Sequence, residues 1–127
     1  MEKTLEFRSD CPMASALDVI GDKWSLLIIR DLAHHQCTYG ELEKIKENIT
    51  TNILADRLKK LVAYELIEKS LYQEKPKRYH YLLTHKGRAL LPILLDLANW
   101  GKEHLCNHGE CLNGDLLSAS KADTSNL

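Results

Sequence analysis

Residues 49–61 form the segment that decides the fold, Ile49-Thr50-Thr51-Asn52-Ile53-Leu54-Ala55-Asp56-Arg57-Leu58-Lys59-Lys60-Leu61. Its leucines recur at spacings of four and three residues, which predicts an amphipathic helix with one buried stripe made of Leu54, Leu58 and Leu61. Thr50 precedes this stripe, and its side-chain oxygen can cap the first turn. Asn48, just before the apolar Ile49, suits a tight turn because asparagine tolerates the left-handed backbone region. The segment is therefore predicted to be a helix that follows a tight turn.

The other side of this helix carries short polar and charged side chains. Thr51 and Asn52 stand at its N-terminal end, where a recognition helix contacts base edges, and asparagine can bind an adenine edge through two hydrogen bonds. Lys59 suits a phosphate contact. Asp56 either pairs with Arg57 or accepts from a cytosine amino group. An ordinary surface helix would show the same pattern, because helix-turn-helix patterns are short and degenerate.

A basic hairpin is predicted downstream of this helix. Residues 66–72 and 79–83 have the composition of two strands, and residues 73–78 between them are expected to form a polar loop. Lys75, Lys77 and Arg78 would give its tip a positive charge suited to a phosphate backbone or a minor groove. A solvated turn is the alternative, since turns are polar in any case. A recognition helix and a basic wing together indicate DNA binding more strongly than either element alone.

The flanking segments predict further helices. Pro12 suits the first position of a helix that ends at Ile20 before Gly21. Asp22 is expected to cap a second, mostly buried helix that continues to Leu32, and a third helix would carry Leu42 and Ile45.

A long final helix is predicted from Thr84 to about Leu105, with a kink at Pro92. Apolar side chains surround most of it, and a small domain cannot easily bury such a helix alone. We therefore expect a homodimer, because symmetric pairing is the commonest oligomeric state; packing within one chain is the alternative. The expected dimer residues are Leu90, Leu94, Leu97 and Trp100.

Length and composition are those of one small domain. The chain has 127 residues, 44% of them hydrophobic, and no uninterrupted apolar run long enough to span a membrane. Its start lacks the apolar segment of a secretory signal, so a cytoplasmic location with four reduced cysteines is expected. We expect a flexible arm over residues 1–10, a folded domain over 11–106, and a polar, flexible tail over 107–127.

Charge is distributed unevenly along the chain. Residues 50–88 hold nine Lys or Arg and four Asp or Glu, a net +5, whereas the remainder has a net −6 and the whole chain −1. This asymmetry can place a basic face on a nearly neutral protein, as a nucleic-acid partner requires, although a solvated face is the simpler alternative.

An ordered series of motifs resembles a known family. It comprises Cys11-Pro12, the segment from Asp18 through Trp24 to Leu32, Tyr39-Gly40-Glu41-Leu42, Ile49-Thr50, the three leucines of the amphipathic helix, Leu66-Ile67, Pro76-Lys77-Arg78-Tyr79-His80-Tyr81, Leu83-Thr84-His85-Lys86-Gly87-Arg88, Leu91-Pro92 and Trp100-Gly101. These motifs resemble the HxlR-type winged-helix transcriptional regulators, distant relatives of the MarR group, and the match runs from Cys11 to about Gly101.

The resemblance implies a mainly α-helical winged helix-turn-helix fold with a small β-hairpin wing and with N- and C-terminal dimerisation helices. It implies a homodimer that places two recognition helices in successive major grooves of a pseudo-palindromic double-stranded DNA site. By position, Thr50, Thr51, Asn52 and Arg57 fall in the family's recognition helix and Arg78 in its wing. The chain departs from the family at Asn52, where a basic residue is common, and at Glu47-Asn48, where Pro-Gly is usual; both departures bear on which DNA sequence is preferred.

Two cysteine-containing segments suggest further chemistry. Cys11 is predicted at a helix N-terminus, where the helix dipole stabilises a thiolate, whereas Asp10 opposes it. Some members of the resembled family use a matching cysteine to sense oxidants or electrophiles; a small residue packed at the dimer contact is the alternative. Cys106, His108 and Cys111 could supply zinc ligands, but their spacing is unlike the usual zinc patterns, so we expect no metal and no cofactor.

The sequence thus predicts a DNA-binding transcriptional regulator whose effector is an oxidant or a small molecule. A winged-helix module that binds protein without sequence-specific DNA binding is the alternative. An enzyme is not expected, because no nucleophile–base spacing, phosphate loop or paired carboxylate motif is present.

Overall fold

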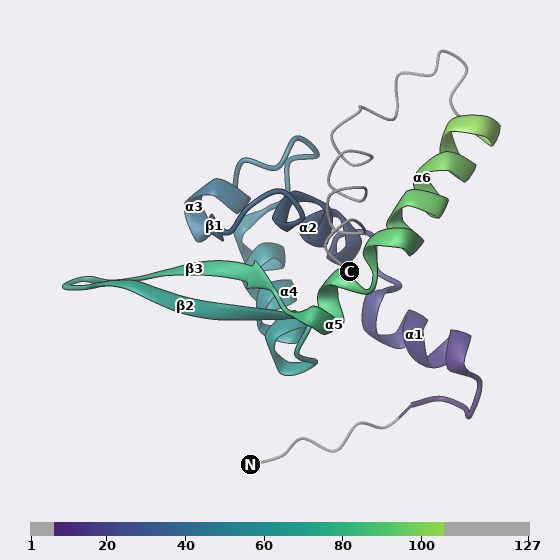
Figure 1. Ribbon diagram of the computed structural model, residues 1–127, viewed down its shortest axis with the longest axis horizontal. Coiled ribbons are helices and arrows are strands. Elements are labelled where there is room, and N and C mark those ends of the chain that lie inside the picture. The colour runs from purple at the N-terminus through teal and green to yellow at the C-terminus, as the bar shows by residue number, and fades with distance from the viewer. Residues whose placement is uncertain (1–6, 106–127) are drawn as a thin grey trace.

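The computed structural model describes residues 7–105 (Figure 1). Its elements in chain order are α1 (Pro12–Ile20), α2 (Ser25–Leu32), β1 (Cys37–Thr38), α3 (Tyr39–Leu42), α4 (Thr51–Ala63), β2 (Ile67–Glu74), β3 (Lys77–Leu83), α5 (His85–Arg88) and α6 (Leu91–His104). The predicted fold class is confirmed: helices surround a small antiparallel sheet whose long hairpin projects from the body as a wing.

The first two helices begin and end close to the predicted residues. Pro12 opens α1, and the amide of Gly21 closes it by donating to the Leu17 carbonyl oxygen at 2.8 Å. Asp22 was predicted to cap α2, but the N-cap residue of α2 is Trp24. Asp22 instead stabilises the turn just before α2, where its carboxylate accepts from the amides of Trp24 and Ser25, each at 3.0 Å. The inner side of α2 is fully buried, as its apolar sequence predicts.

One hydrophobic core joins the helices to the base of the sheet. It is formed by Ile20, Ile28, Ile29, Leu32, Ala33, Cys37, Leu42, Ile45, Ile49, Leu54, Leu58, Leu61, Leu66, Ile67, Leu83, Leu91 and Leu94. Because α2, α4, β2 and β3 all contribute to this cluster, α4 and the hairpin are packed on one common core. Ile45 belongs to the core but lies beyond α3, which is shorter than predicted.

Local contacts fix where α4 begins. Asn48 has a φ of 63°, in the predicted left-handed region, and Ile49 is buried beneath the turn. The Thr50 hydroxyl accepts from the Ile53 amide at 3.4 Å and caps the helix, as predicted. The guanidinium of Arg30 donates to both carboxylate oxygens of Glu47 at 2.9 Å, and this hydrogen bonding lowers the pKa of Glu47. The turn is therefore tied to α2 on one side and to α4 on the other.

The sheet has the order β1-β3-β2 and is antiparallel throughout. The prediction of a loop over residues 73–78 was wrong, because Gln73 pairs with Arg78 and Glu74 with Lys77. Only Lys75 and Pro76 remain between the strands, with a register shift between Leu71 and Gln73. The hairpin is therefore longer and its tip sharper than the sequence suggested.

The C-terminal region contains two helices where one was predicted. Thr84 caps the short α5, its hydroxyl accepting from the Gly87 amide at 3.0 Å. The chain then turns, and α6 begins at Leu91 with Pro92 in its first turn, where proline removes no helical hydrogen bond. The predicted kink within one long helix is thus replaced by a break before Pro92. A Cβ on Gly87 would lie 2.1 Å from the Leu66 carbonyl oxygen, so this close approach of α5 to the start of β2 requires glycine.

The wing and the outer helices lie at opposite ends of the molecule (Figure 1). The β2–β3 hairpin extends from one end, and α1 and the free end of α6 extend from the other, with α2, α3 and α4 between them. None of the helices formed by residues 7–105 combines the length and apolar character needed to cross a bilayer.

Candidate nucleic-acid interface

The α4 helix packs one side against the core and exposes polar side chains on the other. Leu54, Leu58 and Leu61 are at most 2% exposed, whereas Thr51 and Asn52 in the first turn are exposed. Because three leucines anchor one side of the helix, its opposite side is held in a fixed orientation. This division between a buried stripe and an exposed polar face is the one the leucine spacing predicted.

Two of the predicted contact residues are engaged within the chain. The Nε of Arg57 donates to the Asp22 carboxylate at 2.8 Å, and its Nη1 is hydrogen-bonded to Asp56. Of the two roles left open for Asp56, the structure shows the pairing with Arg57. Arg57 thus connects α4 to the turn between α1 and α2, a long-range contact that the sequence pattern does not indicate.

Asp22 is the centre of this connection. Burial alone would raise the pKa of its carboxyl group, but hydrogen bonds from Ser25, from Arg57 and from two backbone amides outweigh burial and lower that pKa from 3.8 to about 2. Asp22 is therefore ionised in the folded protein, and it holds the end of α1, the start of α2 and the middle of α4 together.

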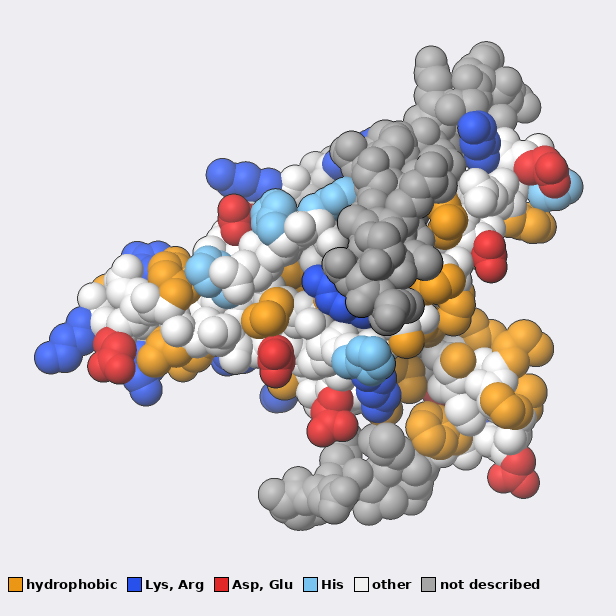
Figure 2. All heavy atoms as spheres, in the orientation of Figure 1, with side chains coloured by type: hydrophobic (Ala, Val, Ile, Leu, Met, Phe, Trp, Pro, Cys, Tyr) orange, Lys and Arg blue, Asp and Glu red, His pale blue; other side chains and the backbone are white. Residues whose placement is uncertain are grey.

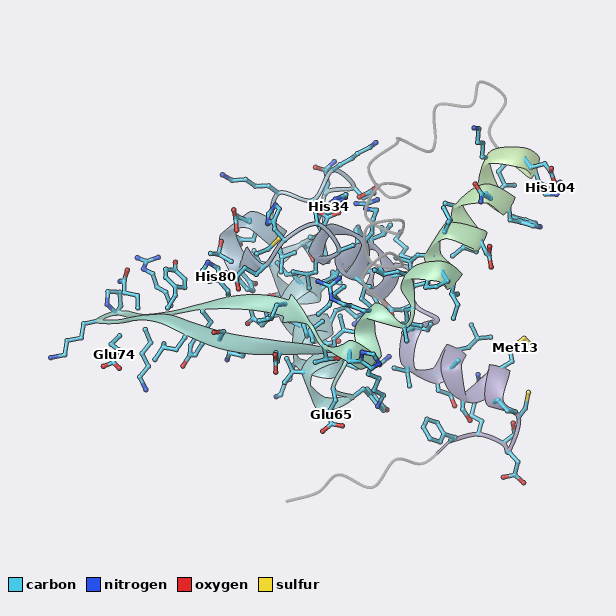
Figure 3. All side chains as sticks on the ribbon, viewed as in Figure 1. Met13, His34, Glu65, Glu74, His80 and His104 are labelled. Atoms are coloured by element: carbon cyan, nitrogen blue, oxygen red, sulfur yellow. The ribbon has the colours of Figure 1, made fainter. Side chains whose placement is uncertain are left out.

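The wing tip is cationic and open. Lys75, Lys77 and Arg78 are exposed, and no salt bridge among residues 7–105 involves any of them. Figure 2 shows Lys and Arg side chains at the end of the hairpin, and Figure 3 labels Glu74 near the same end. Further along the hairpin, Tyr72 stacks on His80 with ring centroids 4.3 Å apart.

An open groove of about 370 Å³ lies between α4 and the base of the wing, and sequence reasoning missed it. It is lined by Tyr39, Ala55, Leu58, Lys59, Val62, Lys69 and Tyr81. Strand periodicity gave one indication: Lys69 is two residues after the buried Ile67 and pairs with Tyr81, so these residues lie on the same side of the sheet. Lys69 itself is exposed.

The opposite end of the molecule exposes large apolar side chains. Met13 and Leu17 on α1 and Leu97 and Trp100 on α6 are 53–70% exposed. Figure 2 shows hydrophobic side chains gathered over these helices, and Figure 3 places Met13 and His104 at their outer ends. Of the other predicted dimer residues, Leu94 is buried in its own core and Leu90 packs partly against that core.

The cysteines occupy different environments. Cys11 is exposed immediately before α1, and its carbonyl oxygen accepts from the Ser15 amide at 3.0 Å. Cys37 is buried, and burial, with smaller contributions from Glu41 and Asp31, raises the pKa of its thiol to about 11. Cys37 is therefore protonated near neutral pH. The weighed zinc ligands Cys106, His108 and Cys111 lie outside the described residues.

A capped helix with an exposed polar N-terminal turn, set beside a basic β-hairpin, defines the class of winged helix-turn-helix transcriptional regulators. Within this class the chain belongs to the HxlR-like helix-turn-helix family, whose model matches residues 19–109.

Similar proteins agree with this assignment. An HTH-type transcriptional regulator of Methanothermobacter thermautotrophicus is 35% identical over 103 residues, which cover 79% of each chain. The crystal structure of a MarR-family transcriptional regulator from Porphyromonas gingivalis W83 superimposes with a TM-score of 0.71 at 35% identity, over 81% of this chain and 100% of that one. The redox regulator HypR in its oxidised form has a TM-score of 0.68 at 32% identity, over 74% of this chain and 97% of that one. The protein is thus a transcriptional regulator of the helix-turn-helix type.

Proposed function

We propose that the protein acts as a homodimer that occupies a pseudo-palindromic operator, with α4 in the major groove and the hairpin tip on the flanking backbone or minor groove. The observation that carries this proposal is the pairing of an exposed Thr51–Asn52 turn on a helix fixed by buried leucines with an exposed cationic wing tip. Short polar side chains discriminate bases, and exposed cations provide affinity without sequence preference.

The contact residues divide by role. Thr50 caps α4 and leaves its backbone close to the groove, Thr51 and Asn52 contact base edges, and Lys59 contacts a phosphate. Lys75, Lys77 and Arg78 neutralise further phosphates from the wing. Arg57 and Asp56 position α4 through Asp22 more than they contact DNA, because the Arg57 guanidinium is already paired.

Charge reversal at the wing tests DNA binding. We expect Lys77→Glu/Arg78→Glu to weaken binding to genomic DNA fragments and to reduce the salt dependence of log Kd by about 1 for each phosphate that the wing no longer neutralises, measured by fluorescence anisotropy. The matched control is Lys44→Glu/Lys46→Glu, which makes the same charge change at exposed positions outside α4 and the hairpin. Unchanged binding by the wing variant would refute the operator function and favour a protein-binding module.

Dimerisation is assigned to the apolar faces of α1 and α6. Leu97 and Trp100 of α6, and Met13 and Leu17 of α1, expose apolar surface whose burial against a partner is favourable. A second copy of the chain would bury this surface and set the distance between the two α4 helices. Leu94 and Leu90 would support the interface from beneath, since they join α6 to the core.

Cys11 is the proposed signal input. It is exposed at the start of α1, so its oxidation would alter the end of the molecule that carries the proposed dimer interface. Hydrogen peroxide would take two electrons from the Cys11 thiol, leaving a sulfenic acid and water. The similarity to the redox regulator HypR supports this choice.

The test compares DNA footprints of the reduced and the peroxide-treated protein. We expect oxidation to remove the footprints of the wild type but not those of Cys11→Ser, whereas Cys37→Ser should respond like the wild type. Footprints of Cys11→Ser that still vanish on oxidation would refute the assignment.

A further inference from the structure

The first turn of α4 has little intrinsic stability. Thr51, Asn52 and Ile53 occupy it, and β-branched residues and asparagine are weaker helix formers than alanine or leucine. No acidic side chain in this turn complements the helix dipole, and the hydrogen bond of the Thr50 cap is long, at 3.4 Å. Because helix ends fray, the turn that carries the proposed base contacts needs restraint from outside α4.

The proposed base contacts also require a fixed backbone. The side chains of Thr51 and Asn52 are short and exposed, so they cannot follow a base edge if the backbone is displaced. A binding group must be held within about 0.5 Å of its productive position by packed and hydrogen-bonded neighbours. Two such restraints reach this turn from other parts of the chain, one from α3 and one from α2.

Tyr39 restrains the turn from α3. Its hydroxyl donates to the carbonyl oxygen of Thr51 at 3.0 Å, and its ring is partly buried against the hydrophobic core. The start of α3 is itself fixed by a capping box, in which the Thr38 hydroxyl accepts from the Glu41 amide and the Glu41 carboxylate accepts from the Thr38 amide. The backbone of the first residue of α4 is therefore attached to a capped element outside that helix.

A bidentate ion pair restrains the segment that leads into the turn. Nη1 and Nη2 of Arg30 donate to the two carboxylate oxygens of Glu47, each at 2.9 Å, and both side chains are partly buried. This parallel geometry fixes orientation as well as distance. Glu47 is followed by Asn48 in the left-handed region and by the buried Ile49, so Arg30 fixes where the chain enters α4.

We propose that Tyr39 and the Arg30–Glu47 pair are positioning residues for base discrimination: they hold the first turn of α4 in helical geometry before DNA is bound, without contacting DNA themselves. Their loss leaves the phosphate contacts of Lys59 and of the wing intact and lowers only the preference for the operator over unrelated DNA. This inference rests on the proposed function, but the restraint itself can be measured without DNA.

Amide hydrogen exchange of the DNA-free protein, followed by NMR, tests the restraint. The Ile53 and Leu54 amides donate to the hydroxyl and the carbonyl oxygen of Thr50, so they exchange when the first turn opens. Tyr39→Phe removes only a hydroxyl and Glu47→Gln removes only a charge, and each should speed this exchange about threefold. The Leu105 amide at the end of α6 should keep its wild-type rate, because its opening breaks neither contact.

DNA binding tests the role in discrimination. An operator obtained by selection from random DNA is compared with an unrelated duplex, and the ratio of the two Kd values should fall about threefold in each single variant and about tenfold in Tyr39→Phe/Glu47→Gln, because only the closed turn reads bases. The Kd for the unrelated duplex should stay that of the wild type, since phosphate contacts do not depend on this turn. Thermal unfolding first shows that each variant is folded.

Matched variants isolate the contacts. Glu43→Gln makes the same substitution at an exposed carboxylate between α3 and α4. Asp31→Asn removes the other carboxylate bound to Arg30 without reaching the turn. Both controls should behave like the wild type in exchange and in discrimination. Arg30→Gln should reproduce Glu47→Gln, and combining these two substitutions should add no further loss, because the two side chains form one contact.

The outcomes separate this inference from the proposed function. Faster exchange with a lower operator preference and unchanged binding to unrelated DNA supports it. Wild-type exchange in Tyr39→Phe and Glu47→Gln overturns it, and so does faster exchange with undiminished discrimination. Equal weakening on both duplexes also overturns it, since the residues then act on stability alone. If the wild type prefers no sequence, the operator function has failed and the role in discrimination fails with it, whereas faster exchange in the variants still establishes the restraint of the turn.

Discussion

The two ends of this molecule both expose side chains to solvent but differ in chemistry. At the wing end, the exposed side chains of the hairpin tip and of the first turn of α4 are polar or charged, although Leu71 and Tyr72 are also exposed along the hairpin. At the other end, exposed side chains on α1 and α6 are large and apolar, among them Met13 and Trp100. Cations and amides are well solvated and can bind a negatively charged partner. Large exposed apolar side chains of this kind favour burial against another apolar surface.

A partly buried ion pair joins α4 to the turn that follows α1. Asp22 lies at the end of α1, and its carboxylate receives Arg57 from α4 at 2.8 Å. If the proposed dimer contact shifts α1, this ion pair would carry the shift to α4, because packed elements move as units.

The largest expected effect comes from disrupting the apolar end. Leu97→Asp/Trp100→Asp should convert a dimer to a monomer and lower operator affinity by roughly 10²–10⁴-fold. The reason is that the α4 helix and wing of a second subunit are then no longer linked to those of the first. Analytical ultracentrifugation and anisotropy measure the two effects. Asn99→Asp on the same helix is the matched control; a double variant that stays dimeric would contradict the assigned interface.

The second largest effect is expected from the buried leucines that pack α4 against the core. Leu54 is completely buried, so Leu54→Ala should lower the free energy of unfolding by about 2–5 kcal/mol, because the truncated side chain packs less and leaves a residual cavity. Urea unfolding followed by circular dichroism measures it. Leu71→Ala on the exposed part of the wing removes the same atoms and should cost far less; equal losses would mean that α4 is not the anchored element.

The Asp22 connection should contribute about 2 kcal/mol, because its pKa is lowered from 3.8 to about 2. Since the folded-state pKa is depressed, this stability is present above pH 3.8 and is lost as pH falls through about 2. Wild type and Asp22→Asn should therefore differ in unfolding free energy at pH 7 and converge toward pH 2. Asp96→Asn, the same substitution at an exposed position of α6, is the matched control. A constant difference for Asp22→Asn would refute the ionic connection.

The smallest effect expected concerns base discrimination. Asn52→Ala should reduce the preference for the correct base pair at one position of each half-site by about 1 kcal/mol, with little change in binding to unrelated DNA. Competition with operators substituted at single positions measures this preference. Lys59→Gln should instead weaken all sequences alike; uniform weakening by Asn52→Ala would assign Asn52 to phosphate contact.

Short-range signals predicted much of this architecture. The leucine spacing indicated the buried side of α4, Thr50 its cap, and Asn48 the turn before it, because each depends on neighbouring residues alone. Pro12 and Gly21 likewise marked the ends of α1.

What failed depended on tertiary contacts. The Arg57–Asp22 and Arg30–Glu47 pairs join residues far apart in the sequence, and no periodicity indicates them. The length of the wing loop was overestimated because polar residues next to a proline are typical of loops. In the structure Glu74 and Lys77 pair as strand residues. The segment from Thr84 to Leu105 was predicted to be one continuous helix, whereas a new helix begins at Leu91 with Pro92 in its first turn. The groove beside α4 requires four elements (α3, α4, β2 and β3) to meet, so no single segment of the sequence indicates it.

The most direct test of a dimeric operator reader is selection of bound sequences from random double-stranded DNA by the purified, reduced protein, followed by footprinting of the enriched sites. We predict an inverted repeat with half-site centres about 10 base pairs, or one helical turn, apart, protected on both half-sites. Lys77→Glu/Arg78→Glu should weaken that protection. No enrichment, or a single unrepeated motif bound by a monomer, would contradict it.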